Sequence, residues 1–389
     1  MKILVALAIL FASAMAFGAD DKDNWPQLGG GPDHNNFRPR TNAVQYPAIL
    51  WKFEKAFGQP TIWNGLLYCG GEALYCLDAE KGTLVASYPP DGIVRFSPAP
   101  ALDKDMVIAR HGQGDVTAFS HKLAQQLWTY APEGPGSEQG HPGSLAEGLY
   151  VFGHGSKVIA LQAKDGKPAW TFETPDKSPV EMTPAIANKL VFFGTSSGSL
   201  FALKVETGQS AWTHKSEAEF GWTYPIATFG AVFIGDRGIR GNRKGALNAF
   251  DLMTGKPKWT QEFGATGMST PGFMPGYVFA GFGKFVALFD IKDGKVKDDP
   301  VFKTDFNPFG SPTVIGDTMV FGNLDGNLYC FDAKTARLLW AVNVGNEVQA
   351  NDFTYWKGRI FLSTSKQLLA IGQAPGKGKA PGGFILKVE

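Results

Sequence analysis

A short phrase recurs along this 389-residue chain, and its regular spacing constrains the fold more than any other feature. The clearest copy runs from Ala249 to Trp259 and reads A-x-D-x-x-T-G-x-x-x-W. Its glycine position recurs at intervals of 42, 42, 42, 47, 39, 42 and 40 residues, at Gly82, Ala124, Gly166, Gly208, Gly255, Gly294, Ala336 and Gly376. A period near 42 residues in a strand-rich chain is typical of a propeller blade, whereas leucine-rich and ankyrin repeats are shorter.

One unit of the repeat, residues 181–214, predicts four antiparallel strands. We expect these strands at 182–186, 190–195, 199–203 and 211–213, with tight turns between them. The glycine supplies the positive φ of the last turn. The aspartate four residues before this position is interpreted as a turn former rather than a catalytic group, at Asp78, Asp251, Asp290 and Asp332. Eight such units predict an all-β, eight-bladed propeller of four-stranded repeats.

Tryptophan follows the glycine position by four residues in five units, at Trp128, Trp170, Trp212, Trp259 and Trp340. An outer-strand indole repeated in this way is expected to pack between neighbouring blades and to bury on the order of 150–250 Å². The eighth unit lacks this strand, but residues 49–53, with Trp51 at their centre, match it. We therefore predict that this N-terminal strand completes the eighth blade and removes both open edges of the ring. Residues 384–388 are the competing candidate.

The N-terminal residues predict that the protein is exported. Lys2, the apolar run at 3–11 and small residues near position 16 predict a cleaved signal peptide over residues 1–19. A membrane anchor would need a longer apolar span. No cysteine lies near the cleavage site, so we expect an exported protein of the periplasm or extracellular space without a lipid anchor. A lead-in at 20–48, a propeller at 49–373 and a tail at 374–389 complete the expected organisation.

Charge and hydropathy exclude some partners. Lys plus Arg number 37 and Asp plus Glu 36, which argues against a nucleic-acid partner. No later segment is apolar enough to cross a bilayer, and a monomeric propeller is expected.

The repeat resembles that of pyrroloquinoline-quinone (PQQ) propellers, with their tryptophan-docking motif, over about residues 49–373. The opening Trp25-Pro26-Gln27 and Asn36-Phe37-Arg38-Pro39 also look like the lead-in of that family. The resemblance implies two functional branches. One holds quinoprotein alcohol and sugar dehydrogenases, and the other holds exported non-catalytic propellers, including the propeller lipoprotein of outer-membrane β-barrel assembly.

Candidate site residues lie where each first strand begins, because propeller ligands usually bind at the mouth of the central channel. These positions carry Gln59, Arg95, Gln139, His141, Glu181, Trp222, Met268, Ser269, Phe309, Ser311, Asn351 and Asp352. A calcium-dependent PQQ site would use Glu181 and Asn351 as ligands, Asp352 as base, Arg95 as cation and Trp222 as aromatic floor. Eight strand starts often supply such a set by chance, so a solvated mouth is the alternative.

Two departures from the dehydrogenase branch favour a non-catalytic protein. Enzymes of that branch share a pair of adjacent cysteines near the cofactor, whereas no two cysteines are adjacent here. They are also longer, with insertions that roof the site, whereas the units of this chain are almost bare. No C-x-x-C-H haem motif occurs either. The predicted function is an exported scaffold that binds protein or glycan partners in the bacterial envelope, with no cofactor. A PQQ- and calcium-dependent dehydrogenase of alcohols or sugars is the alternative.

The cysteines are interpreted as structural. Cys76 and Cys330 share a unit position that is alanine in other copies, which predicts a small buried site. Alignment of the first hairpin places Cys69 opposite Leu74, which makes it a diagonal neighbour of Cys76 at about 7–8 Å. That separation is beyond disulfide reach, and a Cys69–Cys76 bridge is the alternative.

The 47-residue interval contains an insertion at 235–245, between the second and third strands of the fifth unit. Arg237, Arg240, Arg243 and Lys244 in this hairpin are candidates for binding an acidic protein or an anionic glycan. A solvated hairpin is the alternative. The connection at 131–141 is a second candidate for contact on the same face.

Overall fold

The computed structural model of the chain describes residues 23–39, 41, 44–56, 58–89, 94–96, 99–111, 114–134, 141–221, 223–238, 245–263, 269–282, 285–297, 302–303, 311–324, 326–335, 337–345, 348, 353–374 and 385–387. The predicted signal peptide lies outside these residues. No helix in the described part of the chain combines the length and apolarity needed to span a bilayer.

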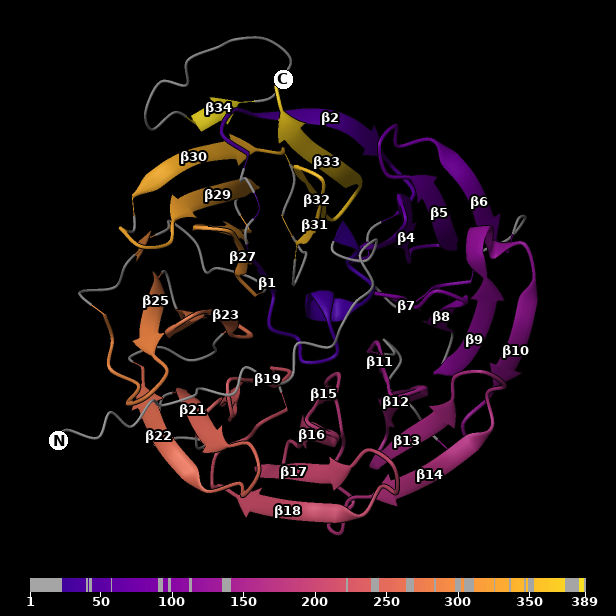
Figure 1. Cartoon of the computed structure of the whole chain (residues 1–389), viewed down its shortest axis with the longest axis vertical. Coiled ribbons are helices and arrows are strands. Elements are labelled where there is room, and N and C mark those ends of the chain that lie inside the picture. The colour runs from indigo at the N-terminus through magenta and orange to yellow at the C-terminus, as the bar shows by residue number, and fades with distance from the viewer. Residues whose placement is uncertain are drawn as a thin grey trace, which may run out of the picture.

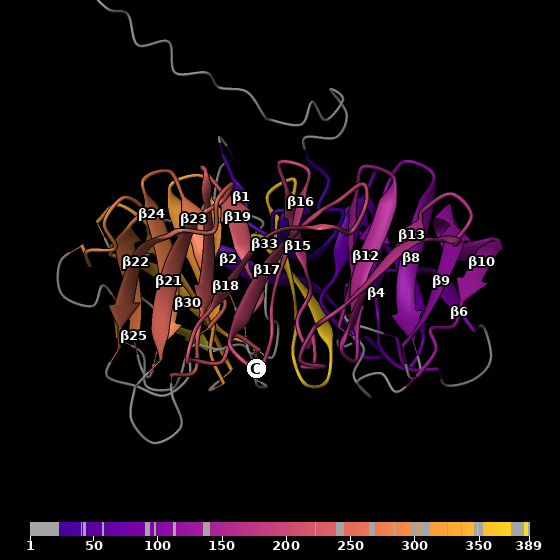
Figure 2. The ribbon, with the colours of Figure 1, turned by 90° about the horizontal axis from the view of Figure 1, so that it is seen from below.

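The described strands form eight sheets arranged in a ring, seen end-on in Figure 1 and from the side in Figure 2. Seven sheets have four strands, and one has six because a short strand is added at each of its edges. The eight-bladed propeller predicted from the repeat is therefore confirmed.

The strands of the first four blades follow one another in chain order, from the inner to the outer edge of each blade. Blade one has β3 (Thr61–Trp63), β4 (Leu66–Cys69), β5 (Leu74–Asp78) and β6 (Leu84–Tyr88); blade two has β7 (Ala101–Leu102), β8 (Met106–His111), β9 (Asp115–Ser120) and β10 (Gln126–Tyr130); blade three has β11 (Ser144–Ala146), β12 (Leu149–His154), β13 (Lys157–Gln162) and β14 (Pro168–Glu173); blade four has β15 (Ala185–Ala187), β16 (Leu190–Gly194), β17 (Ser199–Lys204) and β18 (Ser210–Lys215).

The remaining blades include the strands that join the two ends of the chain. Blade five has β19 (Ile226–Thr228), β20 (Ala231–Gly235), β21 (Ala246–Asp251) and β22 (Pro257–Glu262); blade six has β23 (Gly272–Met274), β24 (Tyr277–Phe282), β25 (Phe285–Asp290) and β26 (Phe302–Lys303); blade seven has β27 (Thr313–Ile315), β28 (Thr318–Gly322), β29 (Asn327–Asp332) and β30 (Leu338–Asn343), with β1 (Phe37–Arg38) and β34 (Ile385–Lys387) at its edges; blade eight has β31 (Thr354–Trp356), β32 (Arg359–Ser363), β33 (Leu368–Gln373) and β2 (Pro47–Phe53). Two short 3-10 helices are η2 (Leu28–Gly30) and η3 (His121–Leu123).

The ring is closed by the N-terminal strand, as predicted. Strand β2 pairs antiparallel with β33 and places Trp51 opposite Ala370. The tail does not compete for this place, because β34 pairs in parallel with β30 and extends blade seven. Pairing the two ends of the chain in one blade leaves no gap in the ring.

In the blades whose outer strand contains the indole, a small residue of the third strand lies opposite it. In blade four, Ala202 on β17 pairs with Trp212 on β18, next to a β-bulge. The same pairing joins Ala118 to Trp128, Ala160 to Trp170, Ala249 to Trp259 and Cys330 to Trp340. Directly paired residues share a face of the sheet, so the small residue leaves room for the ring. Cys76 occupies this position in blade one and pairs with Ala86, so the expected small buried site is confirmed.

The expected register of the first hairpin is wrong by one residue. Cys69 pairs with Tyr75 rather than Leu74, and Cys76 pairs with Tyr68. Since side chains alternate between faces, a shift of one residue places the two cysteines on opposite faces of the sheet. Both thiols, like that of Cys330, are buried and free.

Five of the indoles dock on the next blade through a hydrogen bond and a glycine. Nε1 of Trp170 donates to the Val205 carbonyl at 2.7 Å. Gly208 lies under the ring, where a Cβ would come within 2.6 Å of the indole, and its φ is +69°. The glycine therefore serves the turn, as predicted, and also lets the ring approach the backbone. The same arrangement joins Trp51 to Gly82, Trp128 to Gly166, Trp212 to Gly255 and Trp259 to Gly294.

The lead-in winds around the inside of the ring and hydrogen-bonds to the inner strands of seven blades. Trp25 pairs with Ile62 of blade one, and the Gln27 amide bonds both backbone groups of Leu145 in blade three. Backbone carbonyls of the lead-in accept from blades two, four, five, six and seven, in the pairs Pro26–Leu102, Pro32–Ile186, Asp33–Ala227, Asn35–Phe273 and Asn36–Val314. This segment is the indigo chain at the centre of Figure 1.

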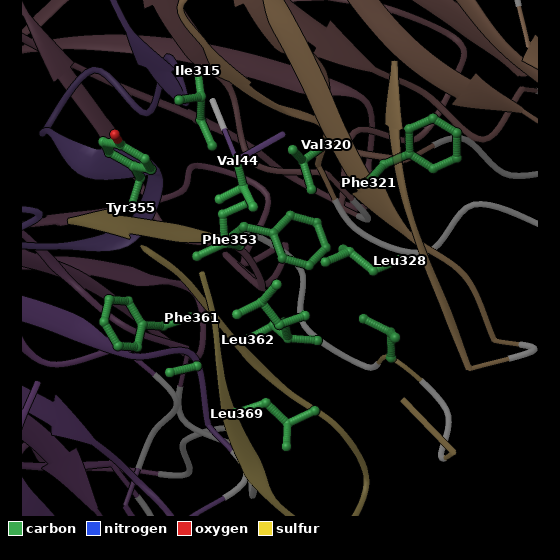
Figure 3. Close-up of a cluster of buried hydrophobic side chains, with 14 of the residues drawn as sticks. Val44, Ile315, Val320, Phe321, Leu328, Phe353, Tyr355, Phe361, Leu362 and Leu369 are labelled. Carbon is green, nitrogen blue, oxygen red and sulfur yellow. The ribbon is translucent and has the colours of Figure 1, made fainter. Parts of the chain in front are cut away.

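The last blade interface depends on the lead-in as well. Trp340 of blade seven donates its Nε1 proton to the Val44 carbonyl at 2.6 Å. The Val44 side chain is buried among residues of blades seven and eight, next to Val320 and Phe353 (Figure 3). Val44 therefore contributes to the interface between the two blades at which the repeat is degraded.

Candidate functional site at the channel mouth

The lead-in contacts both ends of the inner strands. It bonds the turn that follows β3, where Asn24 Oδ1 accepts from the Asn64 amide at 2.8 Å. It also reaches residues that precede inner strands, because Leu28 packs with Ala99 and Tyr224, and Asn36 Nδ2 donates to Ser311 Oγ at 2.8 Å. We call the end of the channel at which the inner strands begin the mouth. The candidate residues belong to this end, and Ser311 is therefore bound by the lead-in.

The predicted quinone set is only partly described. Arg95 precedes blade two and is exposed, whereas Glu181 precedes blade four and is half-buried. Trp222, Asn351 and Asp352 lie outside the described residues. Arg95 and Glu181 are thus two blades apart. Within the described ranges, no three His, Cys, Asp or Glu side chains are grouped closely enough to hold a metal ion.

Glu181 is electrostatically linked to the inserted hairpin. Burial raises the pKa of its carboxyl group, the nearby Arg237 opposes that rise, and Glu219 adds to it. The Arg237 amide also donates to the Glu219 carbonyl at 3.1 Å. A residue proposed for the quinone site and one proposed for partner binding therefore share one part of the mouth, between blades four and five.

The base of the hairpin is held by a buried carboxylate that the sequence analysis missed. Asp236 is 3% exposed, and its Oδ1 accepts the amides of Gly238 at 2.8 Å and Ala246 at 3.0 Å. Its Oδ2 accepts from Asn248 Nδ2 at 2.7 Å, and Asn248 Oδ1 accepts from Thr260 at 2.9 Å. This network fixes both ends of the insertion. The available signal was an aspartate directly after a strand at the start of a glycine-rich loop.

Arg237 emerges from this base and is exposed. Arg240, Arg243 and Lys244 lie outside the described residues, so their part in a basic patch stays a prediction.

A second polar cluster lies in the lead-in. Burial raises the pKa of Asp33 to about 6, although Arg38 acts against it. Burial also lowers the pKa of His34 to about 3 and that of Arg38 to about 10. His34 Nε2 lies 2.9 Å from Ser144 Oγ, and the Arg38 guanidinium lies 4.4 Å from the centre of the Trp25 ring. These groups bind other parts of the fold, so this cluster is a structural one.

An eight-bladed propeller with indoles docked between its blades defines the class of this protein. A family model described as "Outer membrane protein assembly factor BamB", of the PQQ repeat type, matches residues 47–261, 126–342 and 206–377. The matches cover nearly the whole propeller, so the chain belongs to this family.

Individual relatives carry different names. The chain is 26% identical over 257 residues to an outer membrane protein assembly factor BamB of Burkholderia pseudomallei, covering 63% of this chain and 55% of the relative. It is 24% identical over 376 residues to a tetrathionate hydrolase of Acidithiobacillus ferrooxidans, covering 82% of this chain and 64% of the relative. The chain thus spans less than two thirds of either protein.

Quinone-dependent enzymes are also similar. A quinone alcohol dehydrogenase subunit of Gluconobacter oxydans is 31% identical, over 34% of this chain and 20% of the relative. Among solved structures, a europium-containing methanol dehydrogenase superposes with a TM-score of 0.74 at 12% identity, covering 90% of this chain and 98% of that one. At this identity the superposition shows the fold alone.

Proposed function

We propose that this protein is an exported, non-catalytic propeller that binds protein or glycan partners in the bacterial cell envelope. The observation that carries the proposal is the family match across nearly all of the propeller, to a model described as an outer-membrane assembly factor. The Burkholderia relative has the same description. A scaffold of this kind needs a rigid ring and an exposed docking surface, and it needs no reactive group.

The inserted hairpin at 235–245 is the docking surface that we propose. The Asp236 network fixes its base, while Arg237 is exposed at the mouth. An anchored loop loses less conformational entropy on binding than a free one. Guanidinium groups suit carboxylates on an acidic protein or an anionic glycan, because one fork can form two hydrogen bonds.

Pull-down from an envelope extract, with the purified chain as bait, tests this proposal. We expect the wild type to recover a partner that the Arg237→Ala/Arg240→Ala/Arg243→Ala variant loses. A matched control replaces three exposed lysines of the opposite face, Lys164, Lys189 and Lys204, by alanine and should keep the partner. Equal recovery by both variants would exclude the hairpin as the docking site, and no specific partner of the wild type would contradict the scaffold itself.

A PQQ- and calcium-dependent dehydrogenase is the second candidate, favoured by the quinone dehydrogenase relatives and by the half-buried Glu181 at the mouth. When bound, PQQ would accept the electrons of an alcohol or sugar. Of the five residues predicted for such a site, the structure describes Arg95, which is exposed, and Glu181, which adjoins Arg237.

Titration of the purified chain with PQQ and Ca²⁺, followed by absorbance and by dye reduction with alcohols and aldoses, separates the two candidates. The scaffold proposal predicts no turnover. Calcium-dependent binding at micromolar concentration that is abolished by Glu181→Gln or Asn351→Ala would favour the dehydrogenase and contradict our proposal.

A further inference from the structure

A buried guanidinium lies between blades two and three, at the mouth but away from the channel axis. Arg110 is near the end of β8, and its side chain is 2% exposed. Its Nη1 donates to the carbonyls of His141 at 2.6 Å and Gly153 at 3.1 Å, both from blade three. The guanidinium carbon lies 4.7 Å from the centre of the Phe152 ring. These contacts hold the side chain in one orientation.

The other edge of the same guanidinium has no partner. All hydrogen bonds of Arg110 are made by Nη1, while Nε is buried and has none. In the part of the chain that the structure describes, no carboxylate forms an ion pair with it. Nε and Nη2 form the side of the guanidinium that binds two oxygens of one oxyanion. A buried charge without a counter-charge is costly, so this edge indicates a site for an external anion.

A histidine faces the same point. His154 is 4% exposed, and its Nε2 donates to the Gly134 carbonyl at 3.0 Å, which leaves Nδ1 as a buried atom without a partner. A Cβ on Gly114 would lie 2.9 Å from this Nδ1 and 3.1 Å from Nη2 of Arg110. Both nitrogens therefore converge beside Gly114. Glycine is required at this position, because both side chains lie close to where a Cβ would be and its φ is +124°.

We propose that Arg110 and His154 bind a small tetrahedral oxyanion, a sulfate or phosphate group, between blades two and three. Two oxygens of the anion accept from Nε and Nη2 of Arg110. A third oxygen of the anion and Nδ1 of His154 share one proton, which completes the site. Either the ligand or the imidazole carries this proton before binding. Binding therefore takes up a proton whenever the free anion arrives without one, and its affinity falls as pH rises.

The groups around the site set this pH dependence. Burial lowers the pKa of His154, and Arg110 and Lys157 on β13 lower it further, whereas the hydrogen bond to Gly134 and the nearby Asp115 on β9 raise it. The neighbouring imidazoles are neutral near pH 7, because burial lowers the pKa of His111 and takes that of His141 to about 4. Arg110 is thus the cation at the centre of this group, with Tyr150 as the phenol beside it.

Calorimetric titration of the full chain with sodium sulfate and sodium phosphate, at constant ionic strength and pH 6, tests the proposal. We expect saturable binding of at least one anion, weakened about tenfold or more by Arg110→Lys, which keeps the charge but loses the fork. His154→Gln should weaken binding and remove its pH dependence. Arg359→Lys is the matched control, since Arg359 also has a buried Nε without a partner but already pairs with Glu80 at 3.3 Å.

Two results would overturn the proposal: no saturable binding by the wild type, or equal binding by wild type and Arg110→Lys. Circular dichroism of each variant reports whether it folds. If neither site variant folds, the imidazole NMR signals of the wild type decide, because an anion at this site must shift a histidine signal saturably and an anion elsewhere on the surface will not.

Discussion

At the scale of residues, the molecule is built from an indole and a glycine that meet across a blade interface. Trp170 is 9% exposed, its Nε1 proton is bound by Val205, and its ring lies over Gly208. One residue type supplies a large apolar surface and the other supplies the space for it. The repeated residues therefore serve packing between neighbouring blades as well as turns within a blade.

Replacing Trp170 by alanine should lower the free energy of unfolding by about 3–5 kcal/mol, because a buried ring and a hydrogen bond are lost together. Urea denaturation of variant and wild type measures the difference. A loss below about 1 kcal/mol would contradict burial of the indole between the blades.

Gly208→Ala and Gly230→Ala separate the two roles of the docking glycine. Both glycines have φ near +70°, but a Cβ on Gly230 meets nothing within 4 Å, whereas on Gly208 it meets the Trp170 ring. In both variants the free energy of unfolding should fall by about 1 kcal/mol, because alanine is strained in the left-handed backbone conformation. In Gly208→Ala it should fall by roughly a further 1–3 kcal/mol, because the added Cβ overpacks the Trp170 ring. Equal losses by urea denaturation would show that the turn alone requires the glycine.

The pH dependence of stability should contain a term from His34. Its pKa is about 3 in the folded protein against 6.5 ordinarily, so the unfolded chain binds a proton that the folded chain does not. Stability from the neutral imidazole is present above pH 6.5 and is lost as pH falls toward 3. Asp33, whose pKa is raised to about 6, changes stability with pH in the opposite direction. Asp33 is present in both the wild type and a His34→Gln variant, so a comparison of the two isolates the His34 contribution.

We therefore expect the stability advantage of wild type over His34→Gln to shrink by about 2–3 kcal/mol between pH 7 and pH 4.5. Denaturant titrations of both proteins at the two pH values measure it. An advantage that does not change with pH would show that the imidazole is not held neutral in the fold.

At the scale of elements, the lead-in is the segment that links the inner strands. Its side chains and carbonyls supply hydrogen bonds that these strands lack on their channel side. An inner strand is the edge of its sheet, and an unpaired edge has free backbone groups. The lead-in satisfies part of that edge in seven blades, which explains why so irregular a segment is ordered.

Gln27→Ala should lower the free energy of unfolding by about 2–4 kcal/mol, because it leaves both backbone groups of Leu145 buried without a partner. Gln126→Ala is the control, since this exposed amide bonds only the side chains of Tyr88 and Thr129, and we expect a change within about 0.5 kcal/mol. Thermal and urea denaturation compare them. Similar small decreases of the free energy of unfolding in both variants would mean that water replaces the Gln27 amide as the hydrogen-bond partner of Leu145.

At the scale of the whole molecule, the ring is closed by pairing its two ends. Strand β2 belongs to the N-terminal part of the chain and β33 to the C-terminal part, yet they form one sheet. Each blade buries its faces against two neighbours, so one missing strand exposes an edge and weakens two interfaces.

A chain that lacks residues 1–53 should therefore lose its single unfolding transition and self-associate through the free edge of β33. A chain that lacks residues 374–389 keeps the closing strand and should remain monomeric and cooperative. Light scattering after size-exclusion chromatography, with urea denaturation followed by two probes, measures both properties. A monomeric, cooperatively folding chain without residues 1–53 would contradict the importance of ring closure.

Much of this architecture was predictable because it repeats. The glycine turns, the four strands of residues 181–214 and the closing role of Trp51 depend on local geometry that recurs in each unit. The turn role of the aspartates is confirmed as well, for example by Asp78 Oδ1, which accepts the amides of Glu80 and Lys81. The register of the first hairpin was predicted wrongly, because the strand pairing Cys69–Tyr75 leaves one more residue in the loop than the alignment assumed.

The candidate site was less predictable, because its residues come from different blades. The sequence alone determined the blade number, the ring closure and the position of the inserted hairpin, since each is a property of spacing. Only the tertiary structure decided that the lead-in lines the ring, that Glu181 adjoins Arg237, and that Arg110 is buried beside His154. Burial, and the lack of a counter-charge among the described residues, depend on what neighbouring blades place around a side chain, and no local pattern encodes that.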